Sequence, residues 1–261
     1  MRWKCLVAFD GTDFFGWQSQ VGGNTVQDYI ERRLDVIFKQ PVKVHGSSRT
    51  DSGVHAEGLV FHFDAEWKHP VKHLLRAMRV GLPKGILILS VRHVPDSFHA
   101  RYSASGKRYV YRIYEGWAPP FVSRFTYSLE NRRLDTERMK VAAQMLVGSH
   151  DFSAFAADRG DDSHESPVKE LRVLDIVRRG QNVKIVFEGS GFLYRMARSI
   201  AGALIDVGTG KLDPAHIQTI LESKVRTSLV VTAPALGLTL EEVFYQGEAG
   251  DRCCGGVASG D

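Results

Sequence analysis

Two successive stretches of this chain repeat the same order of hydrophobic patterns, and this repetition constrains the fold more than any other feature. In the first stretch, short apolar or alternating runs typical of strands are interspersed with runs whose apolar residues recur at helical spacing. The predicted elements are strands at residues 3–9, 41–45, 58–64 and 86–92 and helices that begin near Thr25 and Val71. Their order, β-α-β-β-α-β, is that of the ferredoxin-like split βαβ unit.

The second stretch follows a comparable order of patterns. Strands are predicted at 108–115, 170–177, 182–189 and 239–245, and helices at 135–148, at 194–207 and after Asp213-Pro214. The expected fold is α+β, with two ferredoxin-like (RRM-like) halves whose sheets lie side by side around a central catalytic cleft. Residues 1–104 are assigned to the N-terminal half and 105–245 to the C-terminal half. The Gly-rich residues 246–261 are expected to be a disordered tail.

The composition argues against a membrane-spanning protein and gives no sign of a metal site. Hydrophobic residues make up 43% of the chain and charged residues 25%, and no apolar run approaches the roughly 18 residues that a spanning helix needs. The start of the chain lacks the apolar core of a signal peptide, and the cysteines have no zinc-ligand spacing. A cytoplasmic protein is expected. The net charge of +4 is compatible with a polyanionic partner without requiring one.

The segment most unusual in composition is the loop GSSRTDSGVHA at residues 46–56, between two predicted strands. Small and hydroxyl residues surround Arg49, Asp51 and His55, which is typical of a loop that carries a site. By residue type alone, however, Asp51-Ser52-Gly53 is more often a simple turn, because Asp and Gly favour such backbone conformations. Both interpretations remain open on the loop by itself.

Several segments together resemble the tRNA pseudouridine synthase A family. The loop sequence SRTDSGVHA is similar to the family signature RTDAGVHA. The other matching segments, in chain order, are AFDGTDFFGWQSQ (8–20), TVQ (25–27), DSFHARYSASGKRYVYRIY (96–114), HDFSAF (150–155), GFLYRMARSIAGALIDVG (191–208) and PALGLTLEEVFY (234–245). They extend from residue 8 to residue 245 in the family's order, so the resemblance covers nearly the whole chain.

The resemblance implies a tRNA-processing isomerase that converts uridine to pseudouridine in the anticodon stem-loop, at positions 38–40. This reaction breaks the N1–C1′ glycosidic bond, turns the uracil and rejoins it through C5. Because no redox change or group transfer occurs, no cofactor and no metal are expected. The family acts as a homodimer, so the expected partners are tRNA and a second copy of the chain.

The same resemblance implies roles for individual residues. Asp51 matches the catalytic aspartate, a nucleophile that attacks either C6 of the base or C1′ of the sugar. Arg198 matches its ion-pair partner, and its helical spacing sets it apart from the core stripe of that helix. Tyr109 matches the tyrosine that stacks on the uracil, whereas Tyr111, on the same strand face, is interpreted as packing. Arg49 matches the arginine that helps to extrude the nucleotide.

Basic residues are scattered along the chain rather than clustered. If a groove follows the RNA backbone, the first candidates for phosphate contacts are Arg101, Lys107 and Arg108, because they lie near the matched Tyr109.

One departure from the family pattern in the signature loop is at residue 48. Ser48 stands where the family has glycine. If that glycine requires a positive φ, the serine strains the loop by about 1 kcal/mol.

Two other classes of function remain as alternatives. A non-catalytic RNA-binding protein fits the RRM-like halves, although the RYVYRIY strand is a poor match to the RNP1 pattern. A nucleoside or glycoside hydrolase would need a second acid, which the signature loop lacks.

Overall fold

The strands of the protein join into one mixed sheet. The computed structural model describes residues 1–158, 160 and 165–247, and within them the sheet has ten strands. The N-terminal half contains β1 (Arg2–Phe9), α1 (Val26–Phe38), β2 (His45–Gly46), β3 (His55–Asp64), α2 (Val71–Arg79) and β4 (Ile86–Val94). The C-terminal half contains β5 (Ala104–Tyr114), α4 (Thr136–Gln144), β7 (Gly148–Asp151), β8 (Val168–Arg179), β9 (Asn182–Gly189), α5 (Met196–Gly208), α6 (Ala215–Ser223) and β10 (Leu238–Tyr245). The short elements α3 (Pro120–Ser123) and β6 (Tyr127–Ser128) follow β5.

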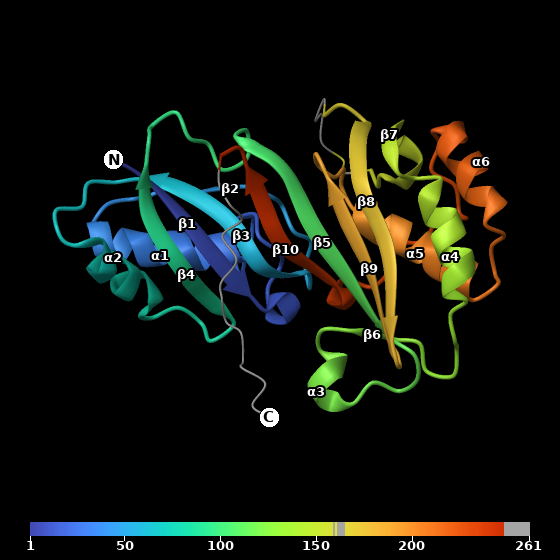
Figure 1. Ribbon diagram of the computed structural model, residues 1–261. Coiled ribbons are helices and arrows are strands. Elements are labelled where there is room, and N and C mark those ends of the chain that lie inside the picture. The colour runs from blue at the N-terminus through green and yellow to red at the C-terminus, as the bar shows by residue number, and fades with distance from the viewer. Residues whose placement is uncertain (159, 161–164, 248–261) are drawn as a thin grey trace.

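Both halves have the same strand order. The N-terminal half is arranged β4-β1-β3-β2, and the C-terminal half is arranged β10-β5-β9-β8. Each is the order fourth, first, third, second that results when two split βαβ units interlock. Figure 1 shows α1 and α2 packed on the N-terminal half and α4 and α5 on the C-terminal half. The prediction of an α+β protein with two ferredoxin-like halves is confirmed.

The two halves are continuous through one short strand pair. β10, from the end of the chain, pairs in parallel with β3 at Thr239↔His55 and Leu240↔Ala56, and it pairs antiparallel with β5 on its other side. Figure 1 shows β10 between β3 and β5 at the centre of the molecule. This pairing fixes the two halves side by side and brings the chain that follows β2 close to the C-terminal half. β5 begins at Ala104, one residue before the predicted boundary, and residues 248–261 of the predicted tail lie outside the described part of the chain.

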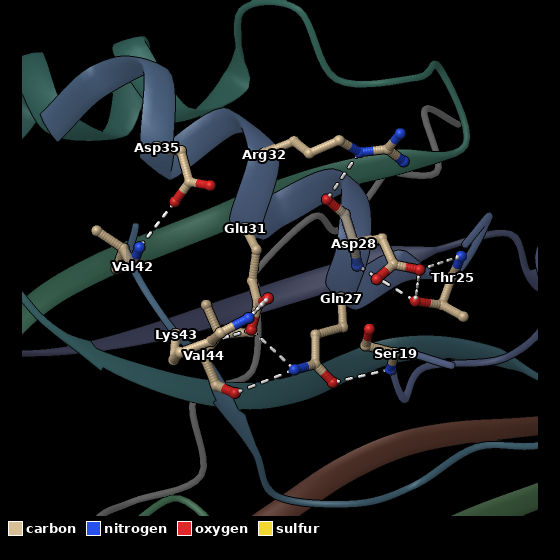
Figure 2. A network of polar contacts seen from close by, with 10 residues as sticks. All are labelled: Ser19, Thr25, Gln27, Asp28, Glu31, Arg32, Asp35, Val42, Lys43 and Val44. Atoms are coloured by element: carbon tan, nitrogen blue, oxygen red, sulfur yellow. Dashed lines mark hydrogen bonds and ion pairs between the residues drawn. The ribbon is translucent and has the colours of Figure 1, made fainter. Parts of the chain in front are cut away.

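The first helix forms where the sequence predicts it. The Thr25 hydroxyl accepts from the Asp28 N–H, and the Asp28 carboxylate accepts from the Thr25 N–H at 3.1 Å, which completes a capping box. Figure 2 shows this cap at the start of α1. Ile30 and Leu34, from the predicted apolar stripe, are fully buried.

The predicted strand at 41–45 is wrong except at its end, because only His45–Gly46 forms a strand. The backbone N–H of Val42 donates to Asp35 Oδ1 at 2.7 Å, and the N–H of Val44 donates to Glu31 Oε1 at 3.0 Å. Figure 2 shows these two contacts between α1 and the extended segment. Carboxylates of α1 thus accept the hydrogen bonds that the carbonyl groups of a neighbouring strand would otherwise accept from these N–H groups. Val42 and Val44 are still buried, so their apolar pattern reports burial rather than a strand.

The helix that carries Arg198 is buried on more sides than its sequence pattern predicts. Ala201 and Ile205, which follow Arg198 at helical spacing on the same side of α5, are 0% and 5% exposed. The reason is a second layer of chain over α5, where the Ala233 N–H donates to the Arg198 carbonyl at 3.0 Å. Only the end of the helix near Arg198 faces the cleft described below. No helix within the described ranges is both long and apolar enough to cross a membrane.

Candidate active site

A cleft of about 1150 Å³ lies between the two halves, where the sequence predicted one. Its walls come from 15–20 and 43–52 in the N-terminal half, from 190–198 in the C-terminal half and from 99–109 at the junction of the two halves. All of the catalytic candidates, Asp51, Tyr109 and Arg198, lie on its surface. The cleft therefore collects segments that are remote in the sequence.

The loop that holds Asp51 is fixed by the segment at 8–20. The Trp17 N–H donates to the Thr50 carbonyl at 3.2 Å. Gly16 has a φ of +81°, and a Cβ at this position would lie 2.3 Å from the same carbonyl oxygen, so no side chain fits here. The loop itself turns at Gly53, with φ +79°, and the Val54 N–H donates to the Asp51 carbonyl at 3.1 Å. Asp51-Ser52-Gly53 is thus a turn, and this turn presents the Asp51 side chain to the cleft.

The Asp51 carboxylate forms an ion pair with Arg198. Arg198 Nη1 lies 2.6 Å from Asp51 Oδ2, and Arg198 Nε donates to the Ala233 carbonyl at 2.9 Å. The Asp51 side chain is 17% exposed and the Arg198 side chain is 14% exposed, so Arg198 does not lie on a solvated helix face. The carbonyl contact fixes the plane of the guanidinium, and the fixed guanidinium in turn holds the carboxylate.

Tyr109 lies beside this pair with its hydroxyl group buried. Its OH is 2.8 Å from Ser48 Oγ, and its ring meets Phe192 edge to face with centroids 5.1 Å apart. Burial raises the pKa of Tyr109 to about 12, opposed by the Ser48 hydrogen bond and reinforced by the charge of Asp51. Tyr111 is completely buried and donates to the Pro234 carbonyl at 2.9 Å, which agrees with its interpretation as packing.

Cationic side chains gather at the wall of the cleft near Tyr109. Lys107 Nζ donates to Ser48 Oγ at 3.3 Å. Burial lowers the pKa of Lys107 to about 8, with the charges of Arg101 and Lys169 lowering it further and that of Glu165 raising it. Glu165 pairs with Lys169 at 3.1 Å and with Arg101 at 3.8 Å. This part of the cleft can accept an anionic group such as a phosphodiester.

The remaining predicted contacts divide into one inside the cleft and one outside it. Arg49 is exposed and lines the cleft two positions before Asp51. Arg108 is not among the lining residues, because strand alternation points it to the sheet face opposite Lys107 and Tyr109. There it pairs with Glu188 at 2.7 Å and with Glu242 at 3.4 Å.

The structure adds cleft residues that the sequence interpretation did not select. Ser48 was noted only as a departure from the family, and its contacts with Tyr109 and Lys107 were not foreseen. Phe192 stands in the matched segment at 191–208, so its aromatic ring before Arg198 was a usable signal. Nothing in the sequence indicates that Glu165 meets Lys169 and Arg101. Among the described residues, no three His, Cys, Asp or Glu side chains converge as metal ligands do.

Comparisons with known proteins agree on one family. The family model described as tRNA pseudouridine synthase matches residues 6–103 and 142–246. The chain is 39% identical over 243 residues to tRNA pseudouridine synthase A 2 of Clostridium perfringens, covering 93% of this chain and 98% of that protein. It is 41% identical over 249 residues to tRNA pseudouridine synthase A of Staphylococcus epidermidis, covering 95% of this chain and 92% of that protein.

Similarity to solved structures is more distant. A chain in the crystal structure of a Cbf5-Nop10-Gar1 complex aligns over 92% of this chain and 50% of its own length, with a TM-score of 0.39 and 12% identity. The family is established by the sequence relatives, which match nearly end to end. The protein is a member of the tRNA pseudouridine synthase family, and it is therefore an isomerase that acts on tRNA.

Proposed function

We propose that this enzyme isomerises uridines of the anticodon stem-loop, at positions 38–40 of tRNA, and that Asp51 is its nucleophile. The observation that carries the proposal is the 2.6 Å ion pair between Asp51 and Arg198 on the surface of the cleft. A nucleophilic carboxylate must be held in place, and the guanidinium of Arg198, itself fixed by the Ala233 carbonyl, holds that of Asp51. Asp51 is also partly exposed, so a nucleotide that enters the cleft can reach it.

The chemistry needs only groups that line the cleft. The carboxylate of Asp51 attacks C6 of the base or C1′ of the sugar, the N1–C1′ bond breaks, and the uracil turns so that C5 meets C1′. Reactant and product have the same atoms and the same oxidation state, so the reaction requires no cofactor. Tyr109 is proposed to stack on the base and to meet its C5 edge, and its position in the same cleft as Asp51 supports this role.

The target uridine is proposed to leave the stack and enter the cleft, because the Asp51 and Arg198 side chains are largely buried there. Extrusion costs a few kcal/mol, and a side chain that fills the gap lowers this cost. Arg49 is the candidate, since it is exposed at the cleft next to Asp51. Arg101 and Lys107, on the same wall as Tyr109, are proposed to contact backbone phosphates.

The family resemblance supports two further proposals. The enzyme acts as a homodimer, in which one tRNA contacts both copies, and it works in the cytoplasm, where Cys5 remains a reduced buried thiol. Sedimentation equilibrium of the purified protein with and without tRNA tests the homodimer. A monomer in both conditions would contradict the proposed dimer.

The proposed function is tested with unmodified tRNA that carries tritium at C5 of uracil. The wild-type enzyme is expected to release tritium to water, and Asp51→Ala is expected to release none. A second set of transcripts, with cytidine in place of uridine at positions 38–40, tests the target, because release should then disappear. Release of free uracil would indicate a hydrolase, and binding of tRNA without release would indicate a binding protein.

A further inference from the structure

Ser48 takes up its position in the signature loop without backbone strain. The strain expected from replacing the family's glycine is absent, because Ser48 is not among the described residues with positive φ. Ser48 is only 9% exposed, and it lines the cleft. The signature loop therefore holds the Ser48 hydroxyl group at the wall of the cleft, nearly buried and without backbone strain.

The Ser48 hydroxyl links two groups of the cleft wall. Its Oγ lies 2.8 Å from the Tyr109 OH and 3.3 Å from Lys107 Nζ, so three polar groups form a continuous chain. A serine hydroxyl has one proton to donate and two lone pairs, so it can accept from one neighbour and donate to the other. The chain can run from Lys107 towards Tyr109 or in the reverse direction, because either hydroxyl of the Ser48–Tyr109 pair can be the donor.

At its end of that chain Lys107 can be a donor or an acceptor, depending on whether its amine is charged or neutral. Its amine lies in a partly desolvated wall, next to the cations Arg101 and Lys169 and the carboxylate of Glu165. These surroundings lower the pKa of Lys107 to about 8, so both forms are populated in neutral to mildly alkaline solution. On the other side, Asp51 is the charged group that acts on Tyr109. An ammonium donates to Ser48 Oγ, whereas a neutral amine accepts from it.

We propose that Ser48 is a positioning residue that fixes the phenol of Tyr109 and relays a proton between Tyr109 and Lys107. The inference rests on the proposed function, in which Tyr109 meets the C5 edge of the uracil. A glycine at this position would offer no hydroxyl, so the link between Lys107 and Tyr109 depends on the Ser48 side chain. The link serves the last step of the reaction, in which C5 loses its hydrogen.

In that step the C5–H bond breaks, and its electron pair forms the C5=C6 double bond of pseudouridine. The proton passes to Tyr109 Oη, while the Tyr109 proton passes to Ser48 Oγ and the Ser48 proton to the neutral amine of Lys107. The pair displaced from C6 moves to N1, which takes a proton from water, or to the Asp51 carboxylate if Asp51 has attacked C6. The Lys107 ammonium then returns its proton to water.

The test is the pH profile of tritium release from C5 in variants of the relay. For Ser48→Ala and Ser48→Gly, kcat is expected to fall by about tenfold or more with little change in KM, because the base still binds but its proton loses the route away. The rise of the wild-type rate towards alkaline pH, which follows the neutral form of Lys107, should disappear. Ser48→Thr, which keeps the hydroxyl, should restore both kcat and the profile.

Two further variants separate the relay from a structural role. Lys107→Arg keeps a positive charge that never becomes neutral, so it should lose the alkaline rise with Ser48 intact. Ser103→Ala removes a hydroxyl that accepts from the His99 N–H, outside the residues that line the cleft, and should behave as wild type. Thermal unfolding and tRNA binding of each variant are measured alongside, so that misfolding is recognised.

The outcomes are distinct for the two proposals. If folded Ser48→Ala keeps the wild-type kcat and pH profile, the relay is wrong while the proposed function stands. A loss that Ser48→Thr does not restore would likewise overturn the relay. If the wild-type enzyme itself releases no tritium, the proposed function fails first.

Discussion

Arg198 Nη1 lies 2.6 Å from Asp51 Oδ2, although the two residues are 147 positions apart in the sequence. Asp51 belongs to the N-terminal half, and Arg198 belongs to α5 of the C-terminal half. The contact exists because β10 joins β3 to β5 and so fixes one half against the other. The candidate active site is thus a consequence of the junction between the halves, and most of the predictions below probe residues brought together there.

Replacing the carboxylate of Asp51 is expected to abolish turnover and to leave tRNA binding. Asp51→Asn keeps a group of the same size that can accept from Arg198, but it removes the proposed nucleophile. Tritium release should fall by at least about a thousandfold, whereas the dissociation constant for tRNA should stay near the wild-type value. Asp64→Asn, on an exposed carboxylate that pairs with Arg2, is the control and should keep full activity. Substantial turnover by Asp51→Asn would contradict the assignment of the nucleophile.

Arg198 is expected to require its guanidinium and not merely its charge. A lysine cannot contact the Ala233 carbonyl and the Asp51 carboxylate together, as Arg198 does through Nε and Nη1. Arg198→Lys should therefore lower kcat by about tenfold to a hundredfold, because the carboxylate is misplaced. Arg198→Met leaves the partly buried Asp51 without its partner and should also lower the free energy of unfolding by about 1–2 kcal/mol. Single-turnover kinetics and urea unfolding measure the two effects, and wild-type kinetics in Arg198→Lys would contradict the argument.

Tyr109 and Tyr111 point to the same face of β5 and are expected to give opposite results when each is changed to phenylalanine. Tyr109→Phe keeps the ring contact with Phe192 but loses the hydroxyl in the cleft, so kcat should fall by about a hundredfold with tRNA binding retained. Tyr111→Phe leaves the Pro234 carbonyl without its donor, so the free energy of unfolding should fall by about 1–2 kcal/mol with kcat unchanged. A loss of kcat in Tyr111→Phe, together with an unchanged kcat in Tyr109→Phe, would show that Tyr111 is the reactive group.

Salt dependence of tRNA binding is expected to distinguish cations inside the cleft from those outside it. Arg101→Gln and Lys107→Gln should each weaken binding and reduce the slope of log K against log salt by roughly 1, as expected when a phosphate contact is lost. Arg108→Gln removes the same charge from the opposite face of the sheet, where Glu188 and Glu242 hold it, and should change neither quantity. Equal effects of Lys107→Gln and Arg108→Gln would mean that binding responds only to net charge.

Stability is expected to fall below about pH 6.5, and the buried His62 is expected to contribute to this loss. Burial, with the nearby His99 and His45, lowers the pKa of His62 from 6.5 to about 4. Between these values the unfolded chain binds a proton that the folded chain does not, so the free energy of unfolding decreases as the pH falls through this window, by at most about 3 kcal/mol from this residue.

The contribution of His62 is isolated by comparison with a variant. His62→Asn keeps an acceptor for the Ala100 N–H, which now donates to His62 Nδ1 at 3.2 Å, but it does not titrate. Denaturant unfolding at pH 7 and pH 4.5 should show a smaller loss of stability in His62→Asn than in the wild type. His216→Asn, on an exposed position of α6, should lose as much as the wild type. An identical loss in His62→Asn would assign the acid sensitivity to other groups.

Features that depend on neighbours in the sequence were predictable. The cap of α1 needs only Thr25 and Asp28, which are three residues apart, and it forms as predicted. The order of strands and helices follows from the two hydrophobic periods, and it was sufficient to predict two ferredoxin-like halves. Alternation along β5 already implied that Lys107 and Arg108 face opposite sides of the sheet, so their joint assignment to one groove overlooked a rule that the sequence contained.

Features that depend on partners far along the chain were not predictable. The segment at 41–45 has the apolar pattern of a strand, but Asp35 and Glu31 of α1 accept two of its backbone N–H groups. Ser48 was expected to strain its loop only if its position required a positive φ, which it does not, and its hydroxyl meets Tyr109 and Lys107.

The sequence by itself determined the element order, the family and the candidate site residues, because each of these is written in local patterns or motifs. Only the tertiary structure decided which of those residues meet. Strand pairing between β3 and β10, and the packing of the segment around Ala233 on α5, bring Asp51 and Arg198 together and point Arg108 away from the cleft. The physical reason is that such contacts depend on how distant segments pack, and no local period or propensity specifies that packing.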